Sequence, residues 1–238
     1  MSSQNDMYRP QEYTMADRAS TEERAQFIVR TYLHLFGAVI AFVLLETFIQ
    51  LTPIADGMYN MLAATRFGWL AVLGAFVVVS HVANKWAHGS VSLGQQYAAL
   101  ILYVVAEAII FAPLIYMALV FTGPEVIINA AMATSFIFAG LTAVVFITRK
   151  NFSFMGPFLG VMGLSAMAII VVSIIFGFNL GVLFSVAMIA FSSGYILYNT
   201  SNVMHEYNTN QYVAASLTLF AAVALLFWYI LRLFMSRD

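Results

Sequence analysis

The sequence predicts an all-α fold, a polytopic integral membrane protein with seven transmembrane helices. Two observations predict this class. Hydrophobic residues make up 62% of the chain and charged residues 9%, whereas charged residues account for about 25% of an average soluble domain. The apolar residues are also gathered into long windows of roughly 20 residues, the length that crosses a hydrocarbon core of about 30 Å.

The windows follow one another through most of the chain. They cover about residues 27–51, 67–84, 95–121, 126–148, 155–176, 181–201 and 212–234. Turn-forming residues separate them, such as Pro53, Gly123 with Pro124, and Asn151, because glycine, proline and asparagine favour turns and helix ends. The sequence shows no fixed-period repeat, so residues 26–238 are expected to form one helical bundle. A polar turn before residue 212 makes the last two windows a hairpin around which the other helices would pack.

Residues 1–25 are polar and carry both signs of charge, unlike a cleaved signal peptide. We interpret them as a mobile cytoplasmic tail. Seven Lys and Arg residues lie on the N-terminal side of the alternating windows, namely Arg9, Arg18, Arg24, Arg30, Lys85, Arg149 and Lys150, and three lie on the other side. This bias places the N-terminus in the cytoplasm. Seven crossings put the C-terminus outside, and a re-entrant last window would return it to the cytoplasm.

Several function classes are disfavoured. The chain has no cysteine and a net charge of −1 with scattered basic residues, which argues against disulfides, thiolate zinc sites and a nucleic-acid partner. It contains no nucleophile elbow, phosphate-binding glycine loop or HExxH motif. We therefore expect no enzyme, cofactor or metal site. One enzyme interpretation stays open, because membrane hydrolases can assemble His, Glu and Ser from separate helices.

Two acidic residues lie within the windows. Glu107 is near the middle of the third window, with no cation in its own helix. A charge near the bilayer centre costs about 2.5–3.5 kcal/mol, so Glu107 is either a protonated or hydrogen-bonded structural carboxyl or a binding position for a cation or a proton. Glu46 lies about one turn from the end of the first window, where we expect its carboxylate to reach water.

Basic and imidazole side chains lie towards the helix ends. His34 and His81 are one to two turns inside the cytoplasmic ends of the first and second windows. Because histidine changes charge near neutral pH, the two could form a proton-responsive pair; neutral hydrogen-bonding is the alternative. Arg30 and Arg232 are expected to contact lipid headgroups.

Short motifs in the right order resemble the Bax inhibitor-1 family of seven-helix membrane proteins, over about residues 25–234. They are FIVRTY at 27–32, AGL at 139–141, TRKNFSFMG at 148–156, YNT at 198–200, YVAASL at 212–217 and LRL at 231–233. The resemblance implies two layers of helices around a central last helix. It also implies a pH-sensitive calcium leak across the membrane and, for this chain, a bacterial inner membrane.

The family's pH sensor is described as a latch of two aspartates, one in a Tyr-Asp-Thr pattern and one in a Tyr-Leu-Asp pattern. The matching positions here are Asn199 and Ala222, and neither side chain titrates. The resemblance therefore implies a cation leak, with Ca²⁺ as the transported ion, under altered pH control. The alternative is a non-transporting membrane partner that modulates a membrane protease or a stress-survival complex.

Overall fold

The computed structural model describes residues 14–65, 67–89 and 92–236. In this part of the chain, seven helices are long and apolar enough to cross a membrane, which confirms the predicted all-α class. The helices are α1 (Thr21–Gln50), α2 (Ile54–Ala63), α3 (Gly68–Gly89), α4 (Leu93–Met117), α5 (Pro124–Thr148), α6 (Gly156–Phe176), α7 (Val182–His205) and α8 (Tyr212–Met235), with short turns η1 (Ala118–Thr122) after α4 and η2 (Ser153–Met155) before α6.

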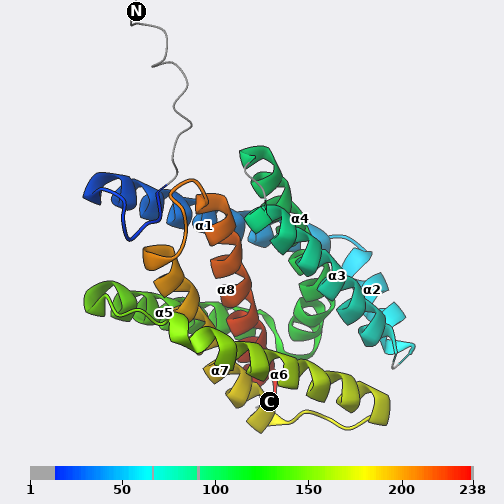
Figure 1. Ribbon diagram of the computed structural model, residues 1–238. Coiled ribbons are helices and arrows are strands. Elements are labelled where there is room, and N and C mark those ends of the chain that lie inside the picture. The colour runs from blue at the N-terminus through cyan, green and yellow to red at the C-terminus, as the bar shows by residue number, and fades with distance from the viewer. Residues whose placement is uncertain (1–13, 66, 90–91, 237–238) are drawn as a thin grey trace, which may run out of the picture.

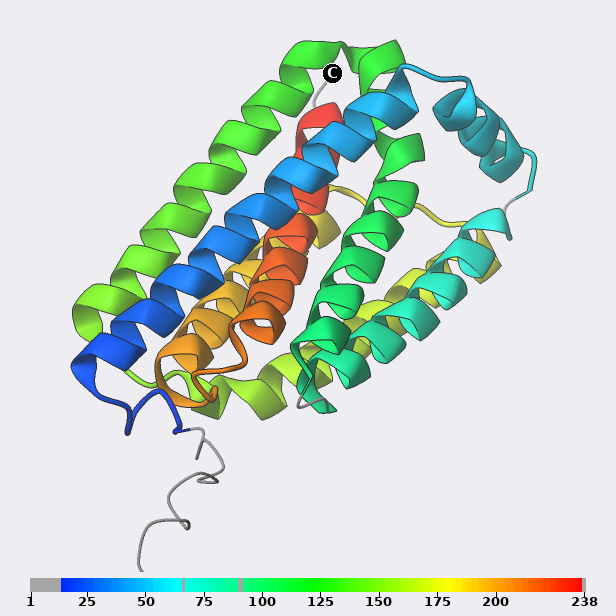
Figure 2. The same ribbon diagram turned by 90° about the horizontal axis from the view of Figure 1, so that it is seen from above.

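Helix α8 is the centre of the bundle (Figures 1 and 2). It packs against α1, α3, α4, α5 and α7. Of its apolar window, 72% is buried, compared with 61% for α4 and at most 28% for the other spans. The predicted central position of the last helix is therefore confirmed. Most of the apolar windows of the outer helices are not buried inside the bundle, so these surfaces are available for contact with lipid.

Small side chains explain how so many helices approach α8. Ala214, Ala215 and Ala222 are fully buried on it, and in a bilayer such residues allow close backbone contact. Aromatic rings fill the remaining space: Phe42 of α1 lies 5.2 Å from Phe111 of α4 in an edge-to-face arrangement, a geometry that aromatic pairs prefer.

The start of α1 and the segment that follows α1 differ from the sequence prediction. Helix α1 begins at Thr21, before the apolar window, because Ser20 and Glu23 form a capping box there. The ten-residue helix α2, which has no counterpart among the windows, lies beside α1 and α4. It buries Ala55 and Leu62 and is too short to cross a membrane.

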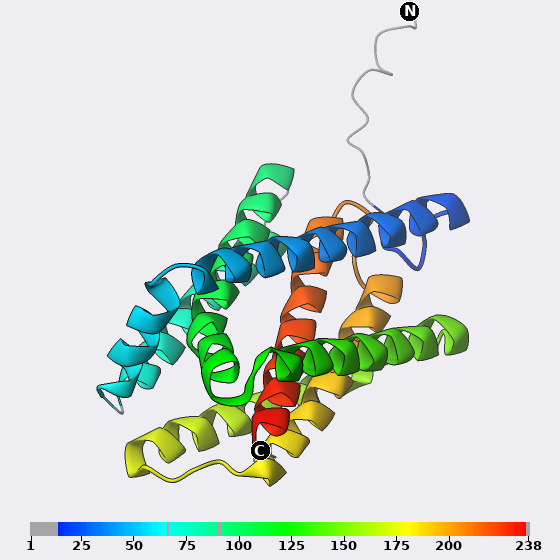
Figure 3. The same cartoon turned by 180° about the vertical axis from the view of Figure 1, so that it is seen from behind.

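The segment before α1 is attached to the loop between α7 and α8, which Figure 3 shows from behind. The backbone N–H of Ala16 donates to the Tyr207 carbonyl at 2.8 Å, and the N–H of Thr209 donates to the Thr14 carbonyl at 3.2 Å. Ala16 is fully buried. Of the predicted mobile tail, residues 14–19 are thus held against this loop, and residues 1–13 lie outside the described residues.

A polar cavity beside α7 and α8

A polar cavity of about 430 Å³ lies where α3, α7, the α7–α8 loop and α8 meet. Its position next to the central helix is unusual in a bundle whose other buried surfaces are mainly apolar, because burying polar groups is costly unless they find partners. The lining residues carry amide, hydroxyl, imidazole and carboxylate groups: Asn84, His88, Tyr195, Tyr198, Asn199, Asn202, Glu206, Tyr207, Gln211 and Thr218.

A chain of hydrogen bonds crosses this cavity. His88 Nε2 lies 3.1 Å from the Tyr207 hydroxyl, and this hydroxyl lies 3.0 Å from Thr218 Oγ1. At the other side of the ring, His88 Nδ1 lies 3.0 Å from the Asn84 carbonyl. Burial raises the pKa of the Tyr207 hydroxyl well above its ordinary value, so Tyr207 stays neutral and can both donate and accept.

The direction of this chain depends on the proton of His88. The Asn84 carbonyl can only accept, so Nδ1 of a neutral His88 carries the hydrogen and Nε2 accepts from Tyr207. A second proton on His88 would make Nε2 a donor to Tyr207, and Tyr207 would then donate to Thr218. Thr218 has its own acceptor, the Ala215 carbonyl at 3.0 Å, so both arrangements leave every hydrogen with an acceptor.

Asn199 lies on the α7 wall of the cavity. It is 3% exposed, and its side-chain amide donates to the Tyr195 carbonyl at 2.9 Å. The rings of Tyr195 and Tyr198 stack beside it, with centroids 6.3 Å apart. Asn199, which the motif resemblance matches to the first latch aspartate, is therefore a hydrogen-bonding residue of the cavity wall.

Ala222 lies one turn beyond Thr218 on α8 and faces the apolar core. It is fully buried, in a cluster with Ile196 and Leu226. A methyl group at this position neither titrates nor forms hydrogen bonds. The two residues that the resemblance matches to the latch are thus an amide on the cavity wall and a methyl group in the core.

Glu107 is a buried carboxyl that joins this region from α4. It is 6% exposed and interacts with the Tyr103 hydroxyl. Tyr103 also lies within electrostatic range of Tyr195. Polar side chains therefore continue from the interior of α4 towards the cavity, and no ion pair forms with Glu107 within the described part of the chain.

The structure does not join the two histidines that the sequence suggested as a pair. Both ring nitrogens of His34 have other partners, the Arg30 carbonyl at 2.7 Å and the Tyr97 hydroxyl at 2.7 Å. His81 is exposed on α3, and among the described residues no hydrogen bond or ring contact connects it to His34. His88 and Tyr207, which line the cavity, were not identified from the sequence. The signal that the sequence offered for this site was Tyr207, an aromatic residue within the polar turn at 205–211.

The expectation for Glu46 is wrong. Its side chain is 4% exposed, because Ile49 and Ala55 pack with α4 at this end of α1. One carboxylate oxygen accepts from Gln50 Nε2 at 3.3 Å, and in the described structure the other is buried without a hydrogen-bond partner. Gln50 also donates to the Ala112 carbonyl at 2.9 Å.

The two arginines at helix ends have protein contacts. Arg232 donates to the Leu180 carbonyl at 3.1 Å, and the Arg30 guanidinium lies 5.7 Å from the centre of the Tyr212 ring. No group of three or more His, Asp or Glu side chains in the described ranges could hold a metal ion.

Comparison with known proteins adds independent information. The family model described as "Inhibitor of apoptosis-promoting Bax1" matches residues 24–238. The chain is 24% identical to Protein LIFEGUARD 4 of Arabidopsis thaliana over 210 residues, which cover 76% of this chain and 83% of that protein.

Two further relatives match over shorter stretches. Bax inhibitor 1 of Schizosaccharomyces pombe is 32% identical over 121 residues, 49% of this chain and 44% of that protein. The modulator of FtsH protease YccA of Escherichia coli is 35% identical over 120 residues, 48% of this chain and 53% of that protein; in a second E. coli strain it is named inner membrane protein YccA. The chain therefore spans about half the length of these two relatives.

Proposed function

The chain belongs to the family of Bax1 inhibitors, the Bax inhibitor-1 family, and from this membership we propose that it is a cation leak of the bacterial inner membrane, with Ca²⁺ as the transported ion. The observation that carries the proposal is Glu107, a buried carboxyl that interacts with Tyr103, whose hydroxyl lies within electrostatic range of the cavity residue Tyr195. An ionisable group inside a membrane bundle is costly to bury, so it is a natural candidate for a position on an ion or proton pathway.

The chemistry of this region suits weak binding of a hard cation. Ca²⁺ takes oxygen ligands, and the cavity with Glu107 offers carboxylate, amide and hydroxyl oxygens. A conducting site has to release its ion, so it holds it loosely. The described residues contain no group of three or more His, Asp or Glu side chains that could hold a metal ion, and loose binding is what this proposal requires.

The pH response of this leak would differ from that of a carboxylate latch. Two coupled carboxylates titrate as a unit, and Asn199 with Ala222 cannot do so. The titratable side chains that line the cavity are His88, Glu206 and its tyrosines. Without a coupled pair of carboxylates at these positions, we propose a gradual dependence of the flux on pH.

Purified protein in liposomes that contain a calcium dye tests the proposal. Wild-type protein should give flux above empty vesicles, and Glu107→Gln, which keeps shape and hydrogen bonding, should lower the flux by at least about tenfold, or 1.4 kcal/mol of barrier. Glu125→Gln is the matched control, because Glu125 is exposed in the first turn of α5. Absence of wild-type flux from about pH 6 to 8 would contradict the leak, and wild-type flux in Glu107→Gln would make Glu107 structural.

A second candidate is a non-transporting partner that modulates a membrane protease. The likeness to the modulator of FtsH protease YccA favours it. Crosslinking in native membranes should then recover a membrane protease in stoichiometric amount, and the liposome assay should show no flux. Recovery of this chain alone would argue against this candidate.

A further inference from the structure

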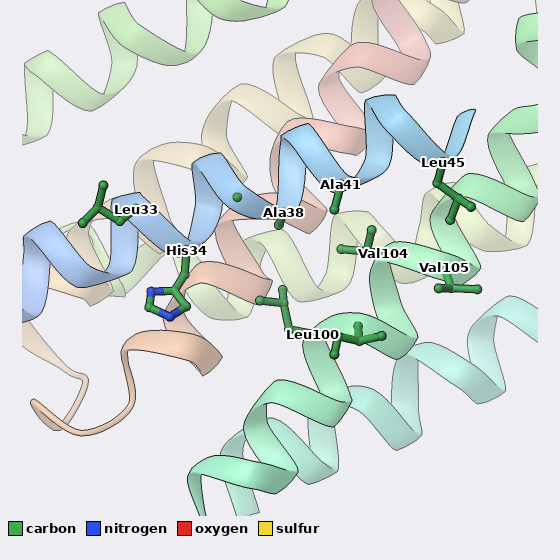
Figure 4. A pocket seen from close by; sticks show the side chains of 10 residues that line it. Leu33, His34, Ala38, Ala41, Leu45, Leu100, Val104 and Val105 are labelled. Atoms are coloured by element: carbon green, nitrogen blue, oxygen red, sulfur yellow. The ribbon is translucent and has the colours of Figure 1, made fainter. Parts of the chain in front are cut away.

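A second cavity, of about 400 Å³, lies between α1 and α4 on the side of the bundle (Figure 4). Apolar side chains of both helices line it, including Ala41 and Leu45 of α1 and Val104 and Val105 of α4. Its rim faces outwards, since Leu33 and Ile101 are each 63% exposed. In a bilayer, a groove with such a rim opens onto hydrocarbon and not onto water.

The sequence of α1 creates this groove. Gly37, Ala38 and Ala41 lie on one face of the helix and line the cavity, because residues three or four apart share a face. A Cβ atom at Gly37 would have no heavy atom within 4 Å. The hollow is therefore wide enough at this point to accept atoms from outside the protein.

One end of the groove is polar and basic. His34 lines the cavity and contacts the Tyr97 hydroxyl at 2.7 Å. Its ring lies 5.0 Å from the ring of Tyr212. Arg30, one turn earlier on α1, is exposed and lies over the same Tyr212 ring. No carboxylate forms an ion pair with Arg30 in the ranges that the structure describes, so its positive charge is uncompensated there.

We propose that this groove binds one anionic phospholipid, with an acyl chain between α1 and α4 and the headgroup phosphate on Arg30. Charge complementarity selects this occupant. The guanidinium carries several N–H donors in a planar fork that matches phosphate oxygens, and the apolar groove continues from the neighbouring His34 along α1. A zwitterionic lipid would fill the same groove but would gain less from the uncompensated cation.

Native mass spectrometry of the detergent-purified full chain tests the proposal, with dioleoylphosphatidylglycerol and dioleoylphosphatidylcholine as probes. Wild-type protein should retain one phosphatidylglycerol and bind phosphatidylcholine at least tenfold more weakly. Arg30→Gln should lose the preference between the two lipids. Arg24→Gln, which removes a charge from the same helix six residues earlier, should keep it.

Filling the groove separates lipid binding from general surface charge. Gly37→Leu should weaken retention of both lipids at least tenfold. Gly140→Leu is the control and should leave lipid retention unchanged. Gly140 lies on the exposed face of α5, and a Cβ atom there would have no heavy atom within 4 Å. If Gly37→Leu does not fold, Ala41→Leu fills the same groove. Equal retention of both lipids by wild type, or equal behaviour of the two glycine variants, would overturn the proposal. So would a change in monomer–dimer distribution with Gly37→Leu and unchanged lipid retention, because a second copy would then be the occupant.

Discussion

Removal of one hydroxyl tests the hydrogen-bond chain of the polar cavity. Tyr207→Phe keeps the ring, which lies 5.8 Å from the His88 ring, and removes an oxygen that contacts both His88 and Thr218. Each net hydrogen bond contributes about 1 kcal/mol. Water can replace the contact of the exposed His88, and Thr218 keeps the Ala215 carbonyl as an acceptor. The unfolding free energy should therefore fall by about 1–2 kcal/mol, roughly a 5- to 30-fold change in the equilibrium constant.

Reversible unfolding in mixed micelles, followed by tryptophan fluorescence, measures this change. Tyr198→Phe is the control, since Tyr198 lines the same cavity and its hydroxyl makes no hydrogen bond with the described residues. A double-mutant cycle with Thr218→Val isolates the Tyr207–Thr218 contact, and we expect a coupling energy of about 1 kcal/mol. If Tyr207→Phe costs no more than Tyr198→Phe, or if the cycle is additive, the hydroxyl is not the connection that the distances indicate.

Two further predictions concern the packing of Tyr198 and the two latch positions. In Gly156→Ala the new Cβ would lie 3.1 Å from the Tyr198 ring, so the ring has to shift and the free energy of unfolding should fall by about 1–3 kcal/mol. Gly160→Ala is the control, because its Cβ would meet nothing within 4 Å, and it should not show this loss. Equal melting temperatures of the two variants would contradict the argument. Asn199→Asp with Ala222→Asp should make the calcium flux depend more steeply on pH from about 5.5 to 8.5 than either single replacement does, because two coupled carboxylates titrate together. A steep response of the wild type would place the sensor elsewhere.

The sequence predicted seven spans, and the described part of the chain contains seven helices of that length and hydropathy. The number could be predicted because the thickness of the bilayer sets a minimum length for each apolar window. The sequence prediction missed α2, a ten-residue helix below that length. This omission also explains the wrong expectation for Glu46, since the end of α1 was assumed to face water and Ala55 of α2 packs there with α4.

The candidate site was predicted only in part. Asn199 was found because it lies in a recognisable motif, and it does line the cavity. His88 and Tyr207 were missed because their contact joins residues 119 positions apart, a separation that no local pattern encodes. The pair of His34 and His81 was suggested by similar depth alone, and depth does not specify the face on which a helix presents a side chain.

The central position of α8 has a consequence for the biogenesis of the protein. Chains are synthesised from the N-terminus, so residues 212–235 reach the membrane after every other span described here. Until then α1, α3, α4, α5 and α7 lack the helix against which all of them pack, and the faces that will surround α8 stay open to lipid or to the insertion machinery. Assembly of the bundle is therefore expected to finish in one late step, and a chain interrupted before Tyr212 should be recognised as incomplete and degraded.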